Sequence, residues 1–348
     1  MTVRRTSAAV LLALGLSLIP TQQAAAAGAG TLPFGSATTV GLHNTYDPAA
    51  FSHLAEALDT GTSMIELDAW TDVVTHEWKV SHSNPLGNSN NCVNAAKPDQ
   101  LYGGGANKNL ESCLDDIRVW LGAHPGSGPL VVKLELKGGF AGNFGMGPTQ
   151  LDALIAAHLG STVFRPADLL AKPGGGAYAT LDEAARAGNW PTRQQLAGRV
   201  LVDVIPGTVE EGNPFDSLHT DVEYSRHLRD LAAAGRLGQA QVFPVVHGAA
   251  AGDPRSAYVD SSIRPWFVVF DGDASAWRNG IDTAWYDHNH YLLVMTDAQN
   301  VAPAISATDP TADEARARTE QLAAAHASIV SSDWRTLREV QSLVLSRG

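Results

Sequence analysis

Two short apolar segments carry charged side chains at alternate positions. In "SMIELDAW", Glu66 and Asp68 are two residues apart, so in a strand both point to the same face. In "LVVKLELK", the same alternation puts Lys133, Glu135 and Lys137 on one face. Carboxylates that are buried close together repel each other unless they share a cation or a proton. The two segments therefore predict a buried cluster of charges that needs a counter-ion.

The oxygen atoms near these segments indicate which cation. Asn44, in "GLHNTY", adds an amide oxygen to the carboxylates of Glu66, Asp68 and Glu135. An all-oxygen set suits Ca²⁺ or Mg²⁺ better than zinc, which would recruit His or Cys. The alternative is that each carboxylate lies at an exposed strand end and pairs with Lys or Arg. Because several strand ends carry such residues together, we favour the metal site.

Two histidines lie beside the acidic segments. His43 precedes Asn44, and His82 follows in "KVSHSN". Histidine suits acid–base chemistry near neutral pH, and two of them can divide the roles of base and acid. The sequence has no serine nucleophile elbow and no glycine-rich phosphate loop, so this set indicates metal-dependent cleavage of a phosphodiester without a covalent protein intermediate.

These side chains must be positioned by a regular fold. Strand-like runs alternate with Ala-rich or amphipathic helical segments, several of which end at Gly. Eight strands in one unbroken alternation predict an α/β fold, a closed (β/α)₈ TIM-type barrel, as a single domain over residues 28–348. Functional side chains of such barrels lie at the carboxyl ends of the strands. The eight runs are "TTVGL", "SMIELDAW", "LVVKLEL", "RVLVDVI", "VFPVV", "WFVVFDG", "YLLVMT" and "ASIVSSD".

The first 27 residues differ from the rest. Two arginines precede an apolar run from Ala8 to Ile19, and small residues follow, as is typical of a secretory signal peptide. The run is too short to span a bilayer and no later stretch is longer, so we expect a secreted protein without a transmembrane anchor. In an oxidising compartment, we expect Cys92 and Cys113 to form a disulfide.

The overall charge restricts the partners. The chain has 24 Lys and Arg against 36 Asp and Glu, a formal net charge of −12. This balance argues against nucleic acid as a partner and against tight electrostatic adhesion to anionic membranes. We expect a monomer that makes transient interfacial contact with its substrate.

The motifs together resemble a known family. In order and spacing, "LHNTY", "MIELDAW", "KVSHSN" and "VVKLELK" resemble the catalytic half of phosphatidylinositol-specific phospholipases C, in particular the secreted bacterial calcium-dependent kind. The stretch "ATLDEAARAGNWPTRQQLAGRVLVDV" is also similar to that bacterial group. The resemblance extends from about Thr38 to Trp334.

The resemblance implies a role for each matched residue. It implies that Ca²⁺ is held by Asn44, Glu66, Asp68 and Glu135. It implies that His43 stabilises the charged transition state and that His82 gives a proton to the departing diacylglycerol oxygen. The inositol 2-hydroxyl would attack, with Glu66 or Glu135 as the base, and the first product would be a cyclic inositol phosphate.

Substrate contacts are predicted less directly. Eukaryotic relatives carry phosphate-binding lysines on the fourth strand, where this chain has Asp203, so plain phosphatidylinositol is the expected substrate. Lys133 or Lys137 would then supply positive charge to the single phosphate. Later strand ends offer further groups for inositol hydroxyls, although aspartates there are also common helix caps. These are His247, Asp271, Asp273, Asp297 and Asp333.

Two other functions fit parts of the pattern. A glycerophosphodiester phosphodiesterase is also a metal-dependent barrel, but it typically has His-Arg-Gly where this chain has "HNT". A non-catalytic barrel that binds inositol lipids is the second, although this sequence keeps both histidines and every metal ligand. No accessory lipid-binding module is visible, so membrane contact is expected from loops at the rim of the barrel.

Overall fold

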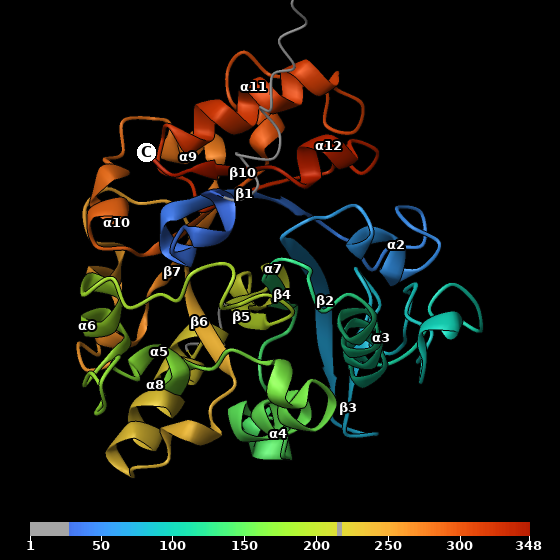
Figure 1. The fold of residues 1–348 in the computed structure, drawn as a ribbon. Coiled ribbons are helices and arrows are strands. Elements are labelled where there is room, and N and C mark those ends of the chain that lie inside the picture. The colour runs from blue at the N-terminus through green and yellow to red at the C-terminus, as the bar shows by residue number, and fades with distance from the viewer. Residues whose placement is uncertain (1–27, 214–217) are drawn as a thin grey trace, which may run out of the picture.

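The computed structural model describes residues 28–213 and 218–348. The predicted signal peptide, residues 1–27, lies outside the described residues. Eight parallel strands close into a barrel in the order β1-β2-β4-β5-β6-β7-β8-β9, and β9 pairs with β1 to complete the ring. Helices surround this ring (Figure 1). The predicted (β/α)₈ barrel is confirmed, and each of the eight apolar runs overlaps one of its strands.

The strands are short and mostly buried. β4 and β5 are buried along their whole length, as expected where parallel strands are covered by helices outside and side chains inside. The strands are β1 (Ala37–Leu42), β2 (Met64–Asp72), β3 (Glu77–Val80), β4 (Leu130–Leu136), β5 (Val200–Pro206), β6 (Val242–His247), β7 (Val269–Asp273), β8 (Leu292–Thr296), β9 (Ile329–Ser332) and β10 (Val344–Ser346).

The helices occupy the connections between strands. Some begin at clear caps: at α11, Thr311 accepts a hydrogen bond from the Glu314 amide while Glu314 accepts one from the Thr311 amide. The α-helices are α2 (Leu54–Leu58), α3 (Leu110–Ala123), α4 (Pro148–His158), α5 (Pro166–Leu170), α6 (Leu181–Arg186), α7 (Thr208–Glu211), α8 (Thr220–Ala233), α9 (Ala274–Trp277), α10 (Ala284–His288), α11 (Ala312–Ala323) and α12 (Arg338–Gln341).

Two strands lie outside the barrel pattern. β3 folds back along β2 in an antiparallel hairpin, in which Ala69 is opposite Val80. β10, near the carboxyl terminus, pairs antiparallel with β1, so the first and last strands lie side by side (Figure 1). The hairpin matters for the site because it brings the end of β3 and the residues that follow it beside Asp68 in β2.

The register of the central strands aligns the charged side chains. Glu66 is opposite Lys133 and Asp68 is opposite Glu135 in the β2–β4 pair. Lys133 is in turn opposite Asp203 of β5. Because partners in a parallel pair point to the same side of the sheet, these residues form charged layers inside the barrel. The apolar residues between them pack against the helices.

A disulfide joins the long loop after β3 to α3. Cys92 and Cys113 are bonded, as predicted, and both are fully buried. The bond anchors the loop that begins with His82. Among the described residues, no helix is long and apolar enough to cross a membrane.

Candidate active site

A cavity of about 210 Å³ opens at the carboxyl ends of the barrel strands. Its lining includes His43 from the end of β1, Glu66 from β2 and Glu135 from β4. Asp333, just after β9, lies on the same wall. The structure therefore brings together residues that are almost 300 positions apart in sequence, because the last barrel strand closes against the first.

Three carboxylates form a cluster beside this cavity. Glu66, Asp68 and Glu135 each offer an oxygen atom, and these atoms all lie within 4.8 Å of one another. The side chains of Glu66 and Asp68 are almost fully buried, and that of Glu135 is 11% exposed. Glu66 Oε2 and both oxygens of Asp68 are buried without a hydrogen-bond partner. Buried carboxylate oxygens are normally satisfied, so the cluster lacks positive charge.

The two lysines of β4 supply part of that charge. Lys137 Nζ lies 2.8 Å from Glu135 Oε1 and 3.3 Å from Asp68 Oδ2. Lys133 Nζ lies 2.8 Å from Asp271 Oδ2 and 3.7 Å from Glu66 Oε2. Both ammonium groups are therefore engaged by carboxylates.

The barrel interior keeps a surplus of acidic groups. Burial, followed by the charges of Glu66 and Glu135, raises the pKa of Asp68 to about 7. Burial also raises the pKa of Asp203 well above its usual range. Among the described residues of the barrel interior, five buried carboxyl groups accompany two buried lysines: Glu66, Asp68, Glu135, Asp203 and Asp271 against Lys133 and Lys137. A divalent cation fits this set, since its donors are oxygen atoms, Asp68 Oδ1 has no hydrogen-bond partner, and the contacts of Glu66 Oε2 and Asp68 Oδ2 with lysines are long ion pairs.

Asn44 belongs to the turn that follows β1. Its φ of 48° lies in the left-handed region, which Asn tolerates better than most residues. Its Oδ1 accepts a hydrogen bond from the Tyr46 hydroxyl at 3.2 Å, and burial beside Asp68 raises the pKa of Tyr46. Thr45 donates to the main-chain oxygen of Glu66 at 2.9 Å. Thr45 and Tyr46 thus hold the asparagine against the carboxylate strand.

His43 is held by a carboxylate that follows β9. Its Nδ1 lies 3.4 Å from Asp333 Oδ1 and 3.3 Å from the Asn44 amide nitrogen. Burial alone would lower the pKa of His43, but the hydrogen bond to Asp333 and the charges of Glu66 and Asp333 outweigh it and raise the pKa to about 9. The contact with Asp333 therefore favours the charged form of the His43 ring, which lines the cavity.

His82 reaches the site through the β2–β3 hairpin. The amide of Ser81 donates to the main-chain oxygen of Asp68 in β2 at 3.2 Å. His82 is the next residue after Ser81, so its main chain lies close to β2. Its side chain is exposed. It does not line the cavity that contains His43. The structure therefore puts His82 at the rim rather than inside.

Comparison with solved structures decides the family. A calcium-dependent phosphatidylinositol-specific phospholipase C from Streptomyces antibioticus superposes with a TM-score of 0.88 at 53% identity, over 91% of this chain and 99% of that one. The chain belongs to this family of phospholipases C. A calcium-dependent phosphoinositol-specific phospholipase C from Pseudomonas sp. matches with a TM-score of 0.68 at 21% identity, over 92% of this chain and 97% of that one, which supports the fold. No family model and no curated protein matches the chain.

In this phospholipase C family member, the remaining predicted residues divide into two groups. His247 and Asp297 line the same cavity as His43. His247 Nδ1 lies 2.7 Å from Glu211 Oε1; burial opposes its charged form, but this contact raises its pKa. Asp273 instead caps α9 by accepting from the Ala276 amide, the helix-cap alternative. Asp271 is the partner of Lys133.

Sequence reasoning missed two contacts of this phospholipase C site. Asp333 was a candidate for inositol hydroxyls, whereas the structure pairs it with His43. The amide of Thr208, at the start of α7, donates to Glu135 Oε1 at 3.1 Å and fixes that carboxylate. Neither contact leaves a signal in the sequence, since each joins residues that are distant along the chain.

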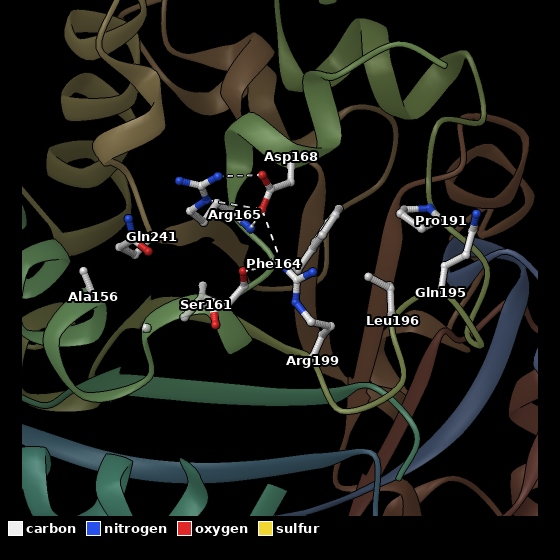
Figure 2. A pocket seen from close by; sticks show the side chains of 12 residues that line it. Ala156, Ser161, Phe164, Arg165, Asp168, Pro191, Gln195, Leu196, Arg199 and Gln241 are labelled. Carbon is white, nitrogen blue, oxygen red and sulfur yellow. Dashed lines mark hydrogen bonds and ion pairs between the residues drawn. The ribbon is translucent and has the colours of Figure 1, made fainter. Parts of the chain in front are cut away.

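A larger cavity of about 660 Å³ lies at the other end of the phospholipase C barrel. Its lining includes Arg199, directly before β5, and Gln241, directly before β6. Figure 2 shows Arg165 and Arg199 both directed at Asp168, with nitrogen-to-oxygen distances of 2.8 and 3.7 Å. Arg199 also donates to the carbonyls of Thr162 and Val163, so both arginines of this cavity have partners, unlike the unpartnered groups at the site containing His43.

Proposed function

We propose that the chain is a secreted, calcium-dependent phospholipase C that cleaves phosphatidylinositol to diacylglycerol and an inositol phosphate. The observation that carries this proposal is the buried carboxylate cluster of Glu66, Asp68 and Glu135, short of positive charge and adjacent to the imidazolium of His43. Membership of a family whose Streptomyces relative is calcium-dependent and phosphatidylinositol-specific supports it.

Calcium would be held by Asn44, Glu66, Asp68 and Glu135. When bound, the cation supplies positive charge that polarises the phosphoryl group and makes a nearby hydroxyl more acidic. The chain's own contribution is the rigid arrangement of these oxygens. Hydrogen bonds hold three of the four ligands in place. Thr45 donates to the main chain of Glu66, Tyr46 donates to Asn44, and the Thr208 amide donates to Glu135.

His43 stabilises negative charge on the phosphate. Its ring is paired with Asp333 and lines the cavity, where negative charge develops on the phosphoryl oxygens. Glu66 or Glu135 accepts the proton of the inositol 2-hydroxyl, since both line the same cavity. That attack gives a cyclic inositol phosphate as the first product, with opening of the ring as a second step.

His82 donates the proton to the departing diacylglycerol oxygen. Its exposed position at the rim suits this role, because the lipid part of the substrate approaches from the membrane while the headgroup enters the cavity. His247 and Asp297 contact the inositol hydroxyls from the far wall. Lys133 and Lys137 act mainly on their carboxylate partners, so most of the charge that binds the phosphate comes from His43 and the cation.

Apolar side chains at the rim provide the membrane contact. Val74, Phe144 and Val209 lie on the segments that follow β2, β4 and β5, and Leu86 lies near His82. All four expose more than half of their surface. Because the net charge is −12, contact through these side chains is transient and hydrophobic rather than electrostatic. The exported protein, residues 28–348, acts as a monomer.

The test compares two substrates with one protein. Residues 28–348 are incubated with phosphatidylinositol vesicles or with glycerophosphoinositol, in calcium, and release of inositol phosphate is measured. We expect cleavage of the intact lipid, lost in His43→Ala, and little cleavage of glycerophosphoinositol. Preference for glycerophosphoinositol would favour the glycerophosphodiester phosphodiesterase, and vesicle binding without headgroup release would favour the non-catalytic barrel.

A further inference from the structure

One buried arginine of the described chain has no partner. Four arginines are less than 9% exposed. Three of them have side-chain partners: Arg255 pairs with Asp182 and Asp253, and Arg318 donates to the carbonyls of Ala298 and Pro303. Arg347 donates to the carbonyls of Gly35, Tyr291 and His326, although its Nη2 has no hydrogen-bond partner. The fourth, Arg193, is 7% exposed, and its Nη1 is buried without a hydrogen-bond partner.

Arg193 lies in the "GNWPTRQQLAGR" segment between α6 and β5. Its main-chain amide donates to Leu32 O at 3.0 Å, which ties the segment to the start of the described chain. The side chain lines a cavity of about 270 Å³. Thr62 and Ser63 directly precede β2 and Leu130 begins β4, so this cavity lies at the amino ends of the strands, opposite the catalytic residues.

The cavity offers donors and no acid. The hydroxyl of Ser127, which also lines it, is buried without a hydrogen-bond partner. None of the described residues that line it is Asp or Glu. A β-carbon at Gly128 would lie 3.0 Å from Arg193 Nη2, so the glycine lets the guanidinium approach the main chain closely.

A buried guanidinium without a counter-ion is unfavourable. Burial lowers the pKa of Arg193 to about 10, so the group is still charged at neutral pH. A charge removed from water costs several kcal/mol unless an opposite charge or hydrogen bonds replace the water. Guanidinium groups bind planar or tetrahedral oxyanions through two parallel N–H groups.

We propose that the cavity lined by Arg193 and Ser127 is a binding site for a small oxyanion of the sulfate or phosphate class. Arg193 supplies the charge and Ser127 one hydrogen bond. The neighbouring 660 Å³ cavity does not share this property, because its arginines are paired with Asp168 (Figure 2). The site is at the opposite end of the barrel from the phosphodiester chemistry and does not depend on it.

The test uses sulfate as the probe, without added calcium. Thermal unfolding of residues 28–348 is followed while sodium sulfate is titrated against sodium chloride at constant ionic strength. We expect the wild-type midpoint to rise saturably, as binding to the folded state requires. Arg193→Met should abolish the saturable rise, and the matched control Arg199→Met, which changes an arginine paired with Asp168, should keep it.

Two further results make the test decisive. Without sulfate, Arg193→Met should be at least as stable as the wild type, because it removes an unpaired buried charge. Ser127→Ala should keep the fold and weaken sulfate binding about tenfold, the effect of one hydrogen bond to a charged ligand. Equal sulfate responses in the wild type and Arg193→Met, no response in the wild type, or unchanged affinity in Ser127→Ala would overturn the proposal.

Discussion

Neutralising Asp68 should make the calcium-free protein more stable. Its carboxylate has two acidic neighbours, Glu66 and Glu135, with oxygens within 4.8 Å, and one ammonium, Lys137, at 3.3 Å. At an effective dielectric constant of about 20, each like-charge pair at this distance costs about 3.5 kcal/mol, and the ion pair returns about 5 kcal/mol. The net repulsion is about 2 kcal/mol, so Asp68→Asn should raise the free energy of unfolding by about that amount in chelator.

The assay is urea unfolding of the wild type and Asp68→Asn, each with chelator and with calcium. Calcium should stabilise the wild type through binding to the folded state, and the variant should gain much less. Asp152→Asn is the matched control: Asp152 is also buried but accepts hydrogen bonds from Tyr224, His227 and the Gln241 amide, so its loss should destabilise by about 1–3 kcal/mol. An Asp68→Asn protein less stable than wild type in chelator would refute the charge-surplus reasoning.

Three further predictions concern the acid, the rim and the pH dependence. His82→Ala should lower kcat on phosphatidylinositol by about 10²–10⁴-fold, and much less on an inositol phosphodiester with a nitrophenol leaving group, which needs no protonation; equal losses would remove His82 as the acid. Phe144→Ser should lower turnover of vesicles while leaving turnover of a water-soluble phosphodiester unchanged, and parallel losses would exclude a purely interfacial role. Burial opposes ionisation of Asp182, but hydrogen bonds from Arg255 and Tyr291 outweigh it and lower its pKa below 3.8. Its contribution to stability is therefore full above about pH 4 and is lost as the pH falls further. The free energy of unfolding of Asp182→Asn should therefore fall less steeply below pH 4 than that of the wild type. The same pH dependence in both proteins would contradict this.

The strands and the metal-ligand candidates were predictable because their signals are local. Alternation in "MIELDAW" and "VVKLEL" determines which side chains share a face, and the barrel then brings these faces together. β3 was not predicted as a separate strand because "EWKV" has four residues and no apolar run. β10 has three residues and is only partly buried, so it also lacks a sequence pattern.

Contacts across the barrel could not be predicted from the sequence. Pairing of His43 with Asp333 requires closure of β9 against β1, and the contact of Lys133 with Asp271 requires β4 and β7 to face each other. The predicted phosphate role of Lys133 was a reasonable hypothesis from its position, but the sequence does not reveal that Asp271 lies 2.8 Å from its ammonium. Arg193 carried no signal of its own except membership of a segment similar to the bacterial group.

The central claim is that the carboxylate cluster binds the calcium on which phosphatidylinositol cleavage depends. The most direct measurement is the rate of inositol phosphate release from phosphatidylinositol vesicles by residues 28–348 as free Ca²⁺ is varied from chelator upwards. The predicted result is a saturable rise from near zero, abolished in Asp68→Asn although that protein stays folded. Full activity in chelator, or an unchanged calcium dependence in Asp68→Asn, would contradict the account.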